Sequence, residues 1–266
     1  PSFNSQIKEF LTTPLSKFGS KCDMDDKYID KLAKMGLMDT AINLSNFKEN
    51  KDLKKTDGKK KSTIRGIPKL DDANWAGGQK SDECTLILTE GDSAKSLAIS
   101  GLEIIGRDKY GVFPLRGKVL NVKGDDKNMG KKIAENIEIT NLKKIMGLQS
   151  DKKYTSTKDL RYGSVMLMTD QDEDGSHIKG LLFNLFQSLW PGLFKMDGFN
   201  KSMLTPIVKA SKGKQIKSFY NLSDYEKWKK DKKGWTIKYY KGLGTSTPKE
   251  AKEYFRDMKI INYIFE

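Results

Sequence analysis

Hydrophobic and polar positions follow the same order twice along the chain: a short apolar run, an acidic turn and a helical pattern. The first unit is "TLIL", "TEGDS" and "AKSLAISGL", and the second begins with "SVMLM" and "TDQDEDG". The second turn precedes apolar residues spaced as one broad helical stripe: Ile178, Leu181, Leu182, Leu185, Phe186, Leu189 and Trp190. Two strand–turn–helix units predict an α/β fold, a parallel sheet flanked by helices. Ligands of such sheets gather at the carboxyl ends of the strands, where both acidic turns are expected.

The remaining segments predict an N-terminal helical and linker region and a C-terminal α+β extension. "DDKYIDKLAKMGLMDTAINL" predicts a helix with Ile29, Leu32, Leu37 and Ile42 on one face. "KENKDLKKTDGKKKSTIR", Lys48 to Arg65, indicates a solvated linker, with a specific binding arm as the alternative. After Pro206, "PIVKA" and "WTIKYY" predict strands and "SDYEKWKKD" a helix. Thr247, Pro248 and Glu250 form a capping box that starts a last helix.

These patterns divide the chain into four parts. Residues 1–60 form the helical and linker segment, 61–82 a connecting loop, 83–200 the α/β core and 201–266 the extension. The chain opens with "PSFNSQ", without an initiator methionine, so we expect a piece of a longer protein.

Composition restricts the partners and ligands. The 266 residues, 36% of them hydrophobic, suffice for a large core. A net charge of +14 favours a polyanion such as nucleic acid, with solubility alone as the alternative. Cys22, Cys84 and the single His177 are too few for a zinc finger or a disulfide framework, so a metal site must use oxygen ligands. No apolar run approaches the roughly 18 residues of a membrane span, and no membrane association is expected.

The acidic turns predict a magnesium site. Asp170, Asp172 and Asp174 alternate, so in an extended turn their side chains would point the same way, and Glu90 on the neighbouring strand end could complete the cluster. Carboxylates this close repel one another unless a cation lies among them. Magnesium suits such ligands. A solvated acidic turn and a calcium loop are the alternatives, but a calcium loop would place a glutamate where Leu181 stands.

Glycines and basic residues near the acidic turns indicate phosphate binding. Gly91 and Gly175 each follow an acid and precede a helix, whose amides can hold a phosphate. "PLRGKVLNVK" places Arg116 and Lys118 around a glycine, either as a clamp on a nucleic-acid backbone or as an ordinary basic hairpin. His177 stands at a helix start, where it could donate to a DNA phosphate or simply pack; a role as general base would need a nucleophile beside it.

Four motifs in this order carry a family resemblance: "LILTEGDSAKSLA", "GVFPLRGKVLNV", "MTDQDEDGSHIKGLL" and "YYKGLGTSTPKEAKEYF". Together with "IRGIPKLDDANWAGG" they resemble the TOPRIM region of type IIA DNA topoisomerases of the eukaryotic and viral kind, over roughly residues 64 to 257. The resemblance implies a TOPRIM-type sheet that supplies an acidic metal site for reversible double-strand DNA cleavage and strand passage.

The resemblance also implies roles for individual residues. Glu90, Asp170, Asp172 and Asp174 would bind Mg²⁺, with Mn²⁺ or Ca²⁺ able to take its place, and would act in catalysis with Arg116 and Lys118. DNA contacts would come from Arg116, Lys118, Asn121, His177 and Lys179. Gly91, Asp92 and Arg116 would border the pocket of drugs that trap cleaved DNA. The nucleophilic tyrosine would belong to a winged-helix domain beyond Glu266.

The opening "PSFNSQIKEF" resembles the end of the family's ATPase region, where Gln6 and Lys8 would approach the terminal phosphate of ATP and Ile7 departs from the family pattern. The resemblance implies an ATP-dependent homodimer acting on double-stranded DNA in the nucleus, or in host cytoplasm if the source is viral. "KGDDKNMGKKIAENIEI" departs from the expected sequence after the basic motif, which leaves the path of residues 123–132 open. The rival functions are a TOPRIM nuclease or primase and a DNA- and metal-binding module without turnover.

Overall fold

The computed structural model describes residues 27, 30–31, 34–36, 51–123, 129–230 and 232–264. The chain divides into two compact units, Pro1–Lys48 and Glu49–Glu266, and all strands and helices described from residue 51 onward belong to the second. Ile29, Leu32, Leu37 and Ile42 lie outside the described residues, as do Gln6 and Lys8, but the described residues 27, 30–31 and 34 of the expected helix are helical.

The centre of the second unit is a five-stranded sheet with the order β2-β1-β3-β4-β8. The strands β1 (Thr85–Glu90), β2 (Tyr110–Leu115), β3 (Ser164–Met168) and β4 (Asn200–Leu204) are parallel, and β8 (Lys259–Asn262) runs antiparallel to β4. Thr89 is paired with Met168, so β1 and β3 end side by side. The predicted parallel α/β sheet is confirmed, whereas its antiparallel edge was not predicted.

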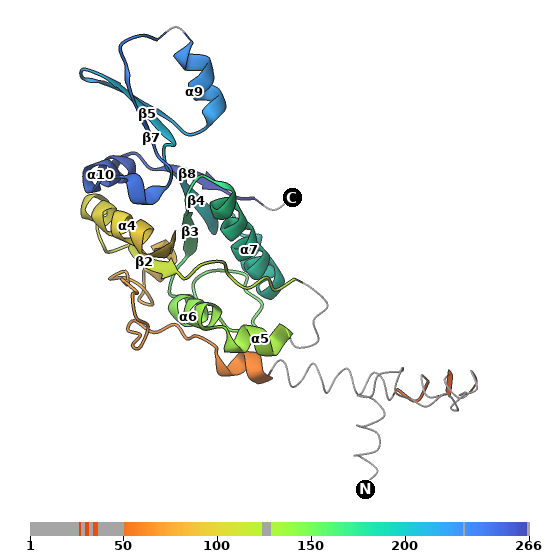
Figure 1. The fold of residues 1–266 in the computed structure, drawn as a ribbon. Helices are drawn as coiled ribbons and strands as arrows, with labels where there is room; N and C mark the ends of the chain where they lie inside the picture. Colours follow the sequence, from red (N-terminus) through yellow and green to blue (C-terminus); the bar gives the residue numbers. More distant parts are fainter. Residues whose placement is uncertain are drawn as a thin grey trace. The chain divides into compact units, whose positions relative to one another are not determined.

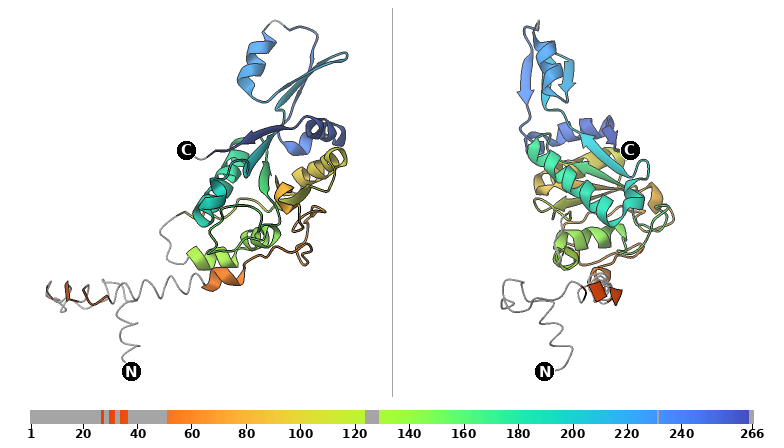
Figure 2. Two further views of the ribbon diagram at one scale, coloured as in Figure 1. Left: turned by 180° about the vertical axis from the view of Figure 1, so that it is seen from behind. Right: turned by 90° about the vertical axis from the view of Figure 1, so that its right-hand side faces the viewer.

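Helices cover both faces of this sheet (Figures 1 and 2). α4 (Gly91–Ile105) and α10 (Pro248–Arg256) pack together on one face, while α6 (Ile137–Met146) and α7 (Glu173–Leu189) cover the other. Strand side chains alternate between the faces. Ile87 packs with the α4 side, whereas Leu86 and Leu88 pack with the α7 side. Burial on both faces explains the continuous apolar runs of β1 and β3.

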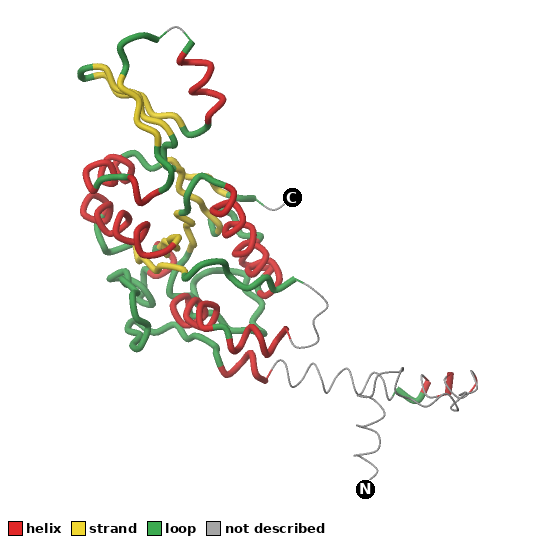
Figure 3. Tube along the Cα trace, viewed as in Figure 1, coloured by secondary structure: helices red, strands yellow, loops and turns green. Residues whose placement is uncertain are grey.

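A second, antiparallel sheet has the order β6-β5-β7 and carries one helix (Figure 3). It consists of β5 (Val208–Lys212), β6 (Gln215–Phe219) and β7 (Thr236–Tyr239), with α9 (Leu222–Lys229) packed on it. Its small core is formed by Val208, Ala210, Phe219 and Tyr225. The short elements η2 (Ser81–Glu83), α5 (Met129–Glu135), α8 (Pro191–Phe194) and η3 (Leu243–Thr245) belong to the same unit, and residues 51–55 are helical as well.

Helix starts follow the sequence signals closely. α10 has the predicted capping box, in which Thr247 Oγ1 accepts from the Glu250 amide and Glu250 accepts from the Thr247 amide. α6 begins after Asn136, whose side chain accepts from the Ile139 amide. Neither α5 nor α6 was predicted; α5 begins at Met129, and residues 124–128 before it are outside the described ranges.

The described part of the expected linker, residues 51–65, packs against the sheet unit. The ammonium of Lys143, which is fully buried, donates to the carbonyl of Leu53 at 2.7 Å and pairs with Asp57 at 2.8 Å. Arg161, also fully buried, donates to the carbonyl of Lys61 at 2.6 Å. The solvated-linker interpretation is therefore wrong for these residues, and the compact unit begins at Glu49, earlier than the boundary expected near residue 60.

No helix within the described ranges is both long and apolar enough to cross a bilayer.

Candidate active site at the carboxyl edge of the sheet

Glu90 and Asp170 meet at the carboxyl edge of the main sheet. Glu90 is the last residue of β1, and Asp170 follows β3 by two residues. The two strands are neighbours in register, so Glu90 Oε2 accepts from the Asp170 amide at 3.2 Å. Glu90 also stands at the N-cap position of α4, but its side chain makes no capping hydrogen bond. Its side chain is thus directed to the β3 edge rather than to the start of its own helix.

The Asp170 carboxylate is held by a turn that lies 73 residues further along the chain. The Leu243 amide donates to Asp170 Oδ1 at 2.6 Å. A Cβ at Gly242 would lie 2.3 Å from Asp170 Oδ2, so only glycine fits at this position without a shift. Sequence reasoning treated "KGLGTS" as a plain turn and missed this contact. Its paired glycines were the available signal, because glycine permits close approach of the backbone.

Asp172 and Asp174 belong to the start of α7. Asp172 is the N-cap, and its Oδ1 accepts from the Gly175 amide at 2.8 Å. Asp174 lies in the first helical turn and pairs with Lys118 Nζ at 2.8 Å. The expectation that three alternating aspartates point the same way in an extended turn is wrong, because the helix begins at Glu173 and rotates Asp174 away.

Burial and charge raise the energy of the ionised Glu90. The pKa of this half-buried carboxyl is raised by desolvation and by the charges of Asp170, Asp172 and Asp174, while the Asp170 amide opposes the shift. Lys179 on α7 compensates in part. Burial lowers the pKa of its ammonium, whereas the charges of Asp172 and Glu90 act to raise it. Lys179, expected to contact DNA, therefore also faces the carboxylates.

The basic motif after β2 borders the same edge. Arg116 and Lys118 are both exposed on either side of Gly117, whose φ of 72° is readily adopted by glycine. Lys118 is held by Asp174 as described above, whereas Arg116 lies close enough to Asp92 to contribute to the lowered pKa of that carboxyl, after the larger effect of Lys69.

The other predicted DNA-binding residues lie along α7. Asn121 Oδ1 accepts from Asn184 Nδ2 at 3.0 Å, which ties the segment after the basic motif to the middle of the helix. His177 is exposed in the first part of α7, near Asp174. The fold thus brings Lys118, His177 and Lys179 to the acidic edge and places Asn121 further along α7.

The two glycines at the helix starts have different structural reasons. Gly91 has a φ of 75° and open space around the position of a Cβ, so its backbone conformation alone favours glycine. At Gly175 a Cβ would lie 2.1 Å from the carbonyl oxygen of Asp170, so close packing requires glycine there. Both glycines do lie at the start of a helix, as expected. At Gly175, however, close packing is sufficient to explain the glycine.

The four carboxylates provide the oxygen ligands that a divalent cation prefers. Among the residues that the structure describes, no three acidic, histidine or cysteine side chains converge as a preformed metal cage. Asp170, Asp172 and Asp174 each bind a protein donor instead. Glu90, with its raised pKa and the neighbouring negative charges, still fits a site completed by a cation that keeps several of its waters.

Comparisons with known proteins identify the two parts of this fold. Residues 85–201 match the Toprim domain family, and residues 203–266 match the C-terminal associated domain of TOPRIM. DNA topoisomerase 2 of Pisum sativum is 54% identical over 263 residues, which cover 97% of this chain and 18% of the relative. DNA topoisomerase 2-beta of Homo sapiens is 56% identical over 272 residues, covering 100% of this chain and 16% of the relative. The chain thus spans less than a fifth of these relatives.

A solved structure is similar as well. The DNA-binding, cleavage and re-ligation domain of Plasmodium falciparum topoisomerase II aligns with a TM-score of 0.71 and 54% identity, over 77% of this chain and 28% of that one. Both the region that matches the Toprim family and the extension after it are therefore found together in known proteins of one kind. The chain belongs to the type II DNA topoisomerase family and comprises its Toprim domain with the C-terminal associated domain.

Proposed function

We propose that this chain supplies the metal-binding half of the DNA-cleaving site in a type IIA DNA topoisomerase. The observation that carries the proposal is the approach of Glu90 to Asp170 at the ends of two neighbouring parallel strands, beside Asp172 and Asp174. The names of the relatives, DNA topoisomerase 2, and of the structural neighbour, a DNA-binding, cleavage and re-ligation domain, support it. A Toprim domain in this family implies a divalent-metal site in general terms.

In this proposal Glu90, Asp170, Asp172 and Asp174 hold Mg²⁺, which Mn²⁺ or Ca²⁺ can replace. When bound, the cation supplies stabilisation of the charge that develops on the leaving oxygen of the DNA backbone. The Leu243 amide keeps Asp170 oriented, and Lys179 limits the repulsion among the carboxylates. Arg116 and Lys118 position the phosphate backbone at the edge. The nucleophilic tyrosine comes from another domain, as the family resemblance implies.

The proposal also covers the substrate, the oligomeric state, the use of ATP and the cellular compartment. Double-stranded DNA is the substrate, and two copies of the protein act as a homodimer. ATP is hydrolysed elsewhere in the protein, with Gln6 and Lys8 near its terminal phosphate. The nucleus is the proposed compartment, with host cytoplasm as the alternative for a viral source.

Magnesium binding by the 266-residue chain tests the proposal directly. We expect Glu90→Gln combined with Asp172→Asn to weaken Mg²⁺ binding about tenfold or more in titration calorimetry, because two oxygen ligands lose their charge. Asparagine is itself a good N-cap, so α7 should remain intact. The matched control, Glu103→Gln with Glu226→Gln, removes the same charge from exposed positions and should leave the affinity unchanged. Equal affinities in both double variants would remove Glu90 and Asp172 from the metal site.

The same chain distinguishes the rival function in a plasmid assay. With Mg²⁺ and supercoiled plasmid, the chain alone should leave the DNA uncut, because the proposed nucleophile lies in another domain. Nicking by the chain alone that disappears in Glu90→Gln would favour a TOPRIM nuclease instead.

A further inference from the structure

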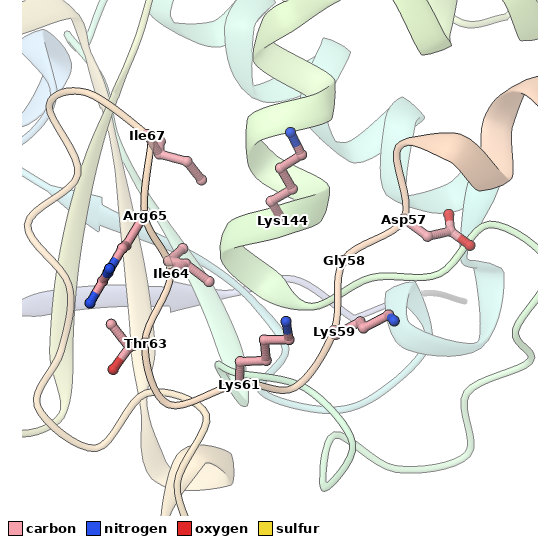
Figure 4. Close-up of a pocket in the computed structure, with 9 residues that line it drawn as sticks. All are labelled: Asp57, Gly58, Lys59, Lys61, Thr63, Ile64, Arg65, Ile67 and Lys144. Carbon is pink, nitrogen blue, oxygen red and sulfur yellow. The ribbon is translucent and has the colours of Figure 1, made fainter.

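A hollow of about 580 Å³ lies between α6 and the segment that follows residue 56, and we call it the basic pocket (Figure 4). Its polar lining consists of Asp57, Lys59, Lys61, Thr63, Arg65 and Lys144. In Figure 4, Lys61 and Lys144 point into the space between the segment and α6, while Thr63 and Arg65 project from the other side of the segment. The pocket therefore presents positive charge along both sides of one stretch of backbone.

The positive charge of the basic pocket is not neutralised by its neighbours. Lys59, Lys61, Arg65 and Lys144 are exposed, and within the described ranges none of the four forms an ion pair. The one carboxylate in the lining, Asp57, is already engaged: it pairs with the buried Lys143 at 2.8 Å and accepts from the amide and the hydroxyl of Ser150. Four cations thus face solvent without an ion-pair partner in the part of the chain that the structure describes.

The wall of the pocket is fixed in place. Buried Arg161 donates to the carbonyls of Lys61 and Ser62, so the backbone that carries the lysines is anchored to the sheet unit. At Gly58 a Cβ would lie 2.1 Å from the carbonyl oxygen of Lys143, which shows how closely this segment packs on α6. Cations on an anchored backbone lose less conformational entropy on binding than those of a flexible basic tail.

The basic pocket lies on a path toward the basic motif. A second hollow, lined by Gly66, Lys69, Arg116 and Asn141, adjoins the same segment and the same helix. Asn141 and Lys144 are three residues apart on α6 and therefore lie on one face of it. This second hollow also contains Glu138, so the cationic surface is concentrated in the basic pocket and again at Arg116.

We propose that the basic pocket is a second contact for the phosphate backbone of duplex DNA, away from the acidic edge. The inference rests on the proposed function, which brings DNA to Arg116 and Lys118. Lys61 on its anchored backbone and Lys144 on α6 suit neighbouring phosphates of one strand, because such contacts position a backbone without reading bases. None of the residues that line the pocket is aromatic, so it lacks the stacking surface on which single strands are held.

Salt-dependent DNA binding tests the pocket. We expect Lys61→Ala with Lys144→Ala, made in the 266-residue chain, to weaken binding of a labelled 30-base-pair duplex and to flatten the plot of log affinity against log salt by about two units. Both side chains are exposed, so the melting temperature should not change. The matched control, Lys214→Ala with Lys227→Ala, removes the same charge from exposed positions in the β5–β6 turn and on α9, and should leave the slope within about half a unit.

A third variant separates the pocket from the proposed function. Arg116→Ala with Lys118→Ala should flatten the slope independently, and the quadruple variant should show the sum of both effects. If the pocket variant behaves like the control while the Arg116 variant flattens the slope, the pocket proposal is overturned and the proposed function stands. If only the pocket variant flattens the slope, the DNA path at the acidic edge is wrong. Pocket-dependent binding of inorganic tripolyphosphate, with an unchanged DNA slope, would overturn the assignment to duplex DNA.

Discussion

At the scale of single residues, the surroundings of Glu90 disfavour the ionised form of its carboxyl group. Its pKa is raised, so the folded state binds the carboxyl proton more tightly than the unfolded chain does, and the contribution of this group to stability decreases as the pH rises through the raised value. Glu90→Gln keeps an oxygen that can accept from the Asp170 amide and removes the repulsion.

We therefore expect Glu90→Gln, without metal at pH 7, to melt at the same temperature as the wild type or up to about 2 °C higher. The difference should shrink at acidic pH, where the wild-type carboxyl is protonated too. If the protein has the proposed function, the same change in its full-length form should depress DNA cleavage about a hundredfold or more, because the proposed metal ligand is lost. A melting temperature lowered by several degrees with normal cleavage would show that Glu90 is a structural residue.

The pKa of Glu250 is shifted in the opposite direction from that of Glu90. Burial alone would raise its pKa, but donors from Lys238, the Thr247 amide and hydroxyl, and Tyr240 outweigh burial and hold the pKa at about 2. Lys238 Nζ lies 2.8 Å from both carboxylate oxygens. These contacts join the strand end of the second sheet to the first turn of α10.

The lowered pKa of Glu250 predicts a pH dependence. Its stabilising effect is present above the ordinary pKa near 4.5 and is lost as the pH falls toward 2. Glu250→Gln should therefore lower the melting temperature by several degrees at pH 7, since a buried charged acceptor costs about 1–3 kcal/mol to remove. Between pH 5 and pH 2 the difference from the wild type should narrow in thermal melts. Glu103→Gln, at an exposed position, serves as the control, and parallel pH profiles for wild type and Glu250→Gln would contradict the prediction.

At the scale of elements, the contact between α4 and α10 depends on one missing side chain. A Cβ at Gly101 would lie 2.1 Å from a ring carbon of the buried Phe255. Alanine normally stabilises a helix interior by about 1 kcal/mol over glycine. Here overpacking should outweigh that gain, because the Phe255 ring would have to move within a filled core.

Gly101→Ala should consequently lower the melting temperature by several degrees, corresponding to about 1–3 kcal/mol. Gly180 on α7 provides a matched control, since it lies inside a helix with nothing within 4 Å of the position of a Cβ. Gly180→Ala should leave the melting temperature unchanged or raise it. Trimming the ring in Gly101→Ala/Phe255→Leu should restore part of the loss, and equal melting temperatures for both alanine variants would exclude close packing as the reason for Gly101.

Elements with a local signal were predictable, and those decided by distant contacts were not. β1, β3 and α7 follow from apolar runs and a broad stripe, and α10 follows from its capping box. The edge strand β8, "KIIN", pairs antiparallel to β4 across more than fifty residues, which no local pattern shows. At the candidate site, the meeting of Glu90 and Asp170 at neighbouring strand ends was predictable from the two acidic turns. The orientation of Asp170 was not, because it depends on Leu243.

At the scale of the whole molecule, two buried cations make the expected linker before residue 65 part of the compact unit. The run of lysines near residue 60 predicted solvent exposure, and Lys59 and Lys61 are exposed. The backbone of this segment is nevertheless fixed at two points, because buried Lys143 donates to the carbonyl of Leu53 and buried Arg161 to the carbonyl of Lys61. A run of lysines predicts that their charged groups are exposed to solvent. It does not predict that a cation from a distant part of the chain will bind the main chain of the same segment. A polar stretch can therefore be part of a compact unit.

The boundary between the two matched families lies inside strand β4, which limits how this part of the protein can recombine. The two family matches meet between residues 201 and 203, inside β4. β4 pairs with β3 on one side and with β8 on the other, so each matched region completes the sheet of the other. A recombination event or a laboratory chimera joined at that point would combine half-strands from two ancestors, and the Asp170 contact with Leu243 would have to survive the exchange. A single crossover should therefore succeed outside Thr85–Asn262, whereas the second sheet should be exchangeable only as an insert joined before Val208 and after Tyr239.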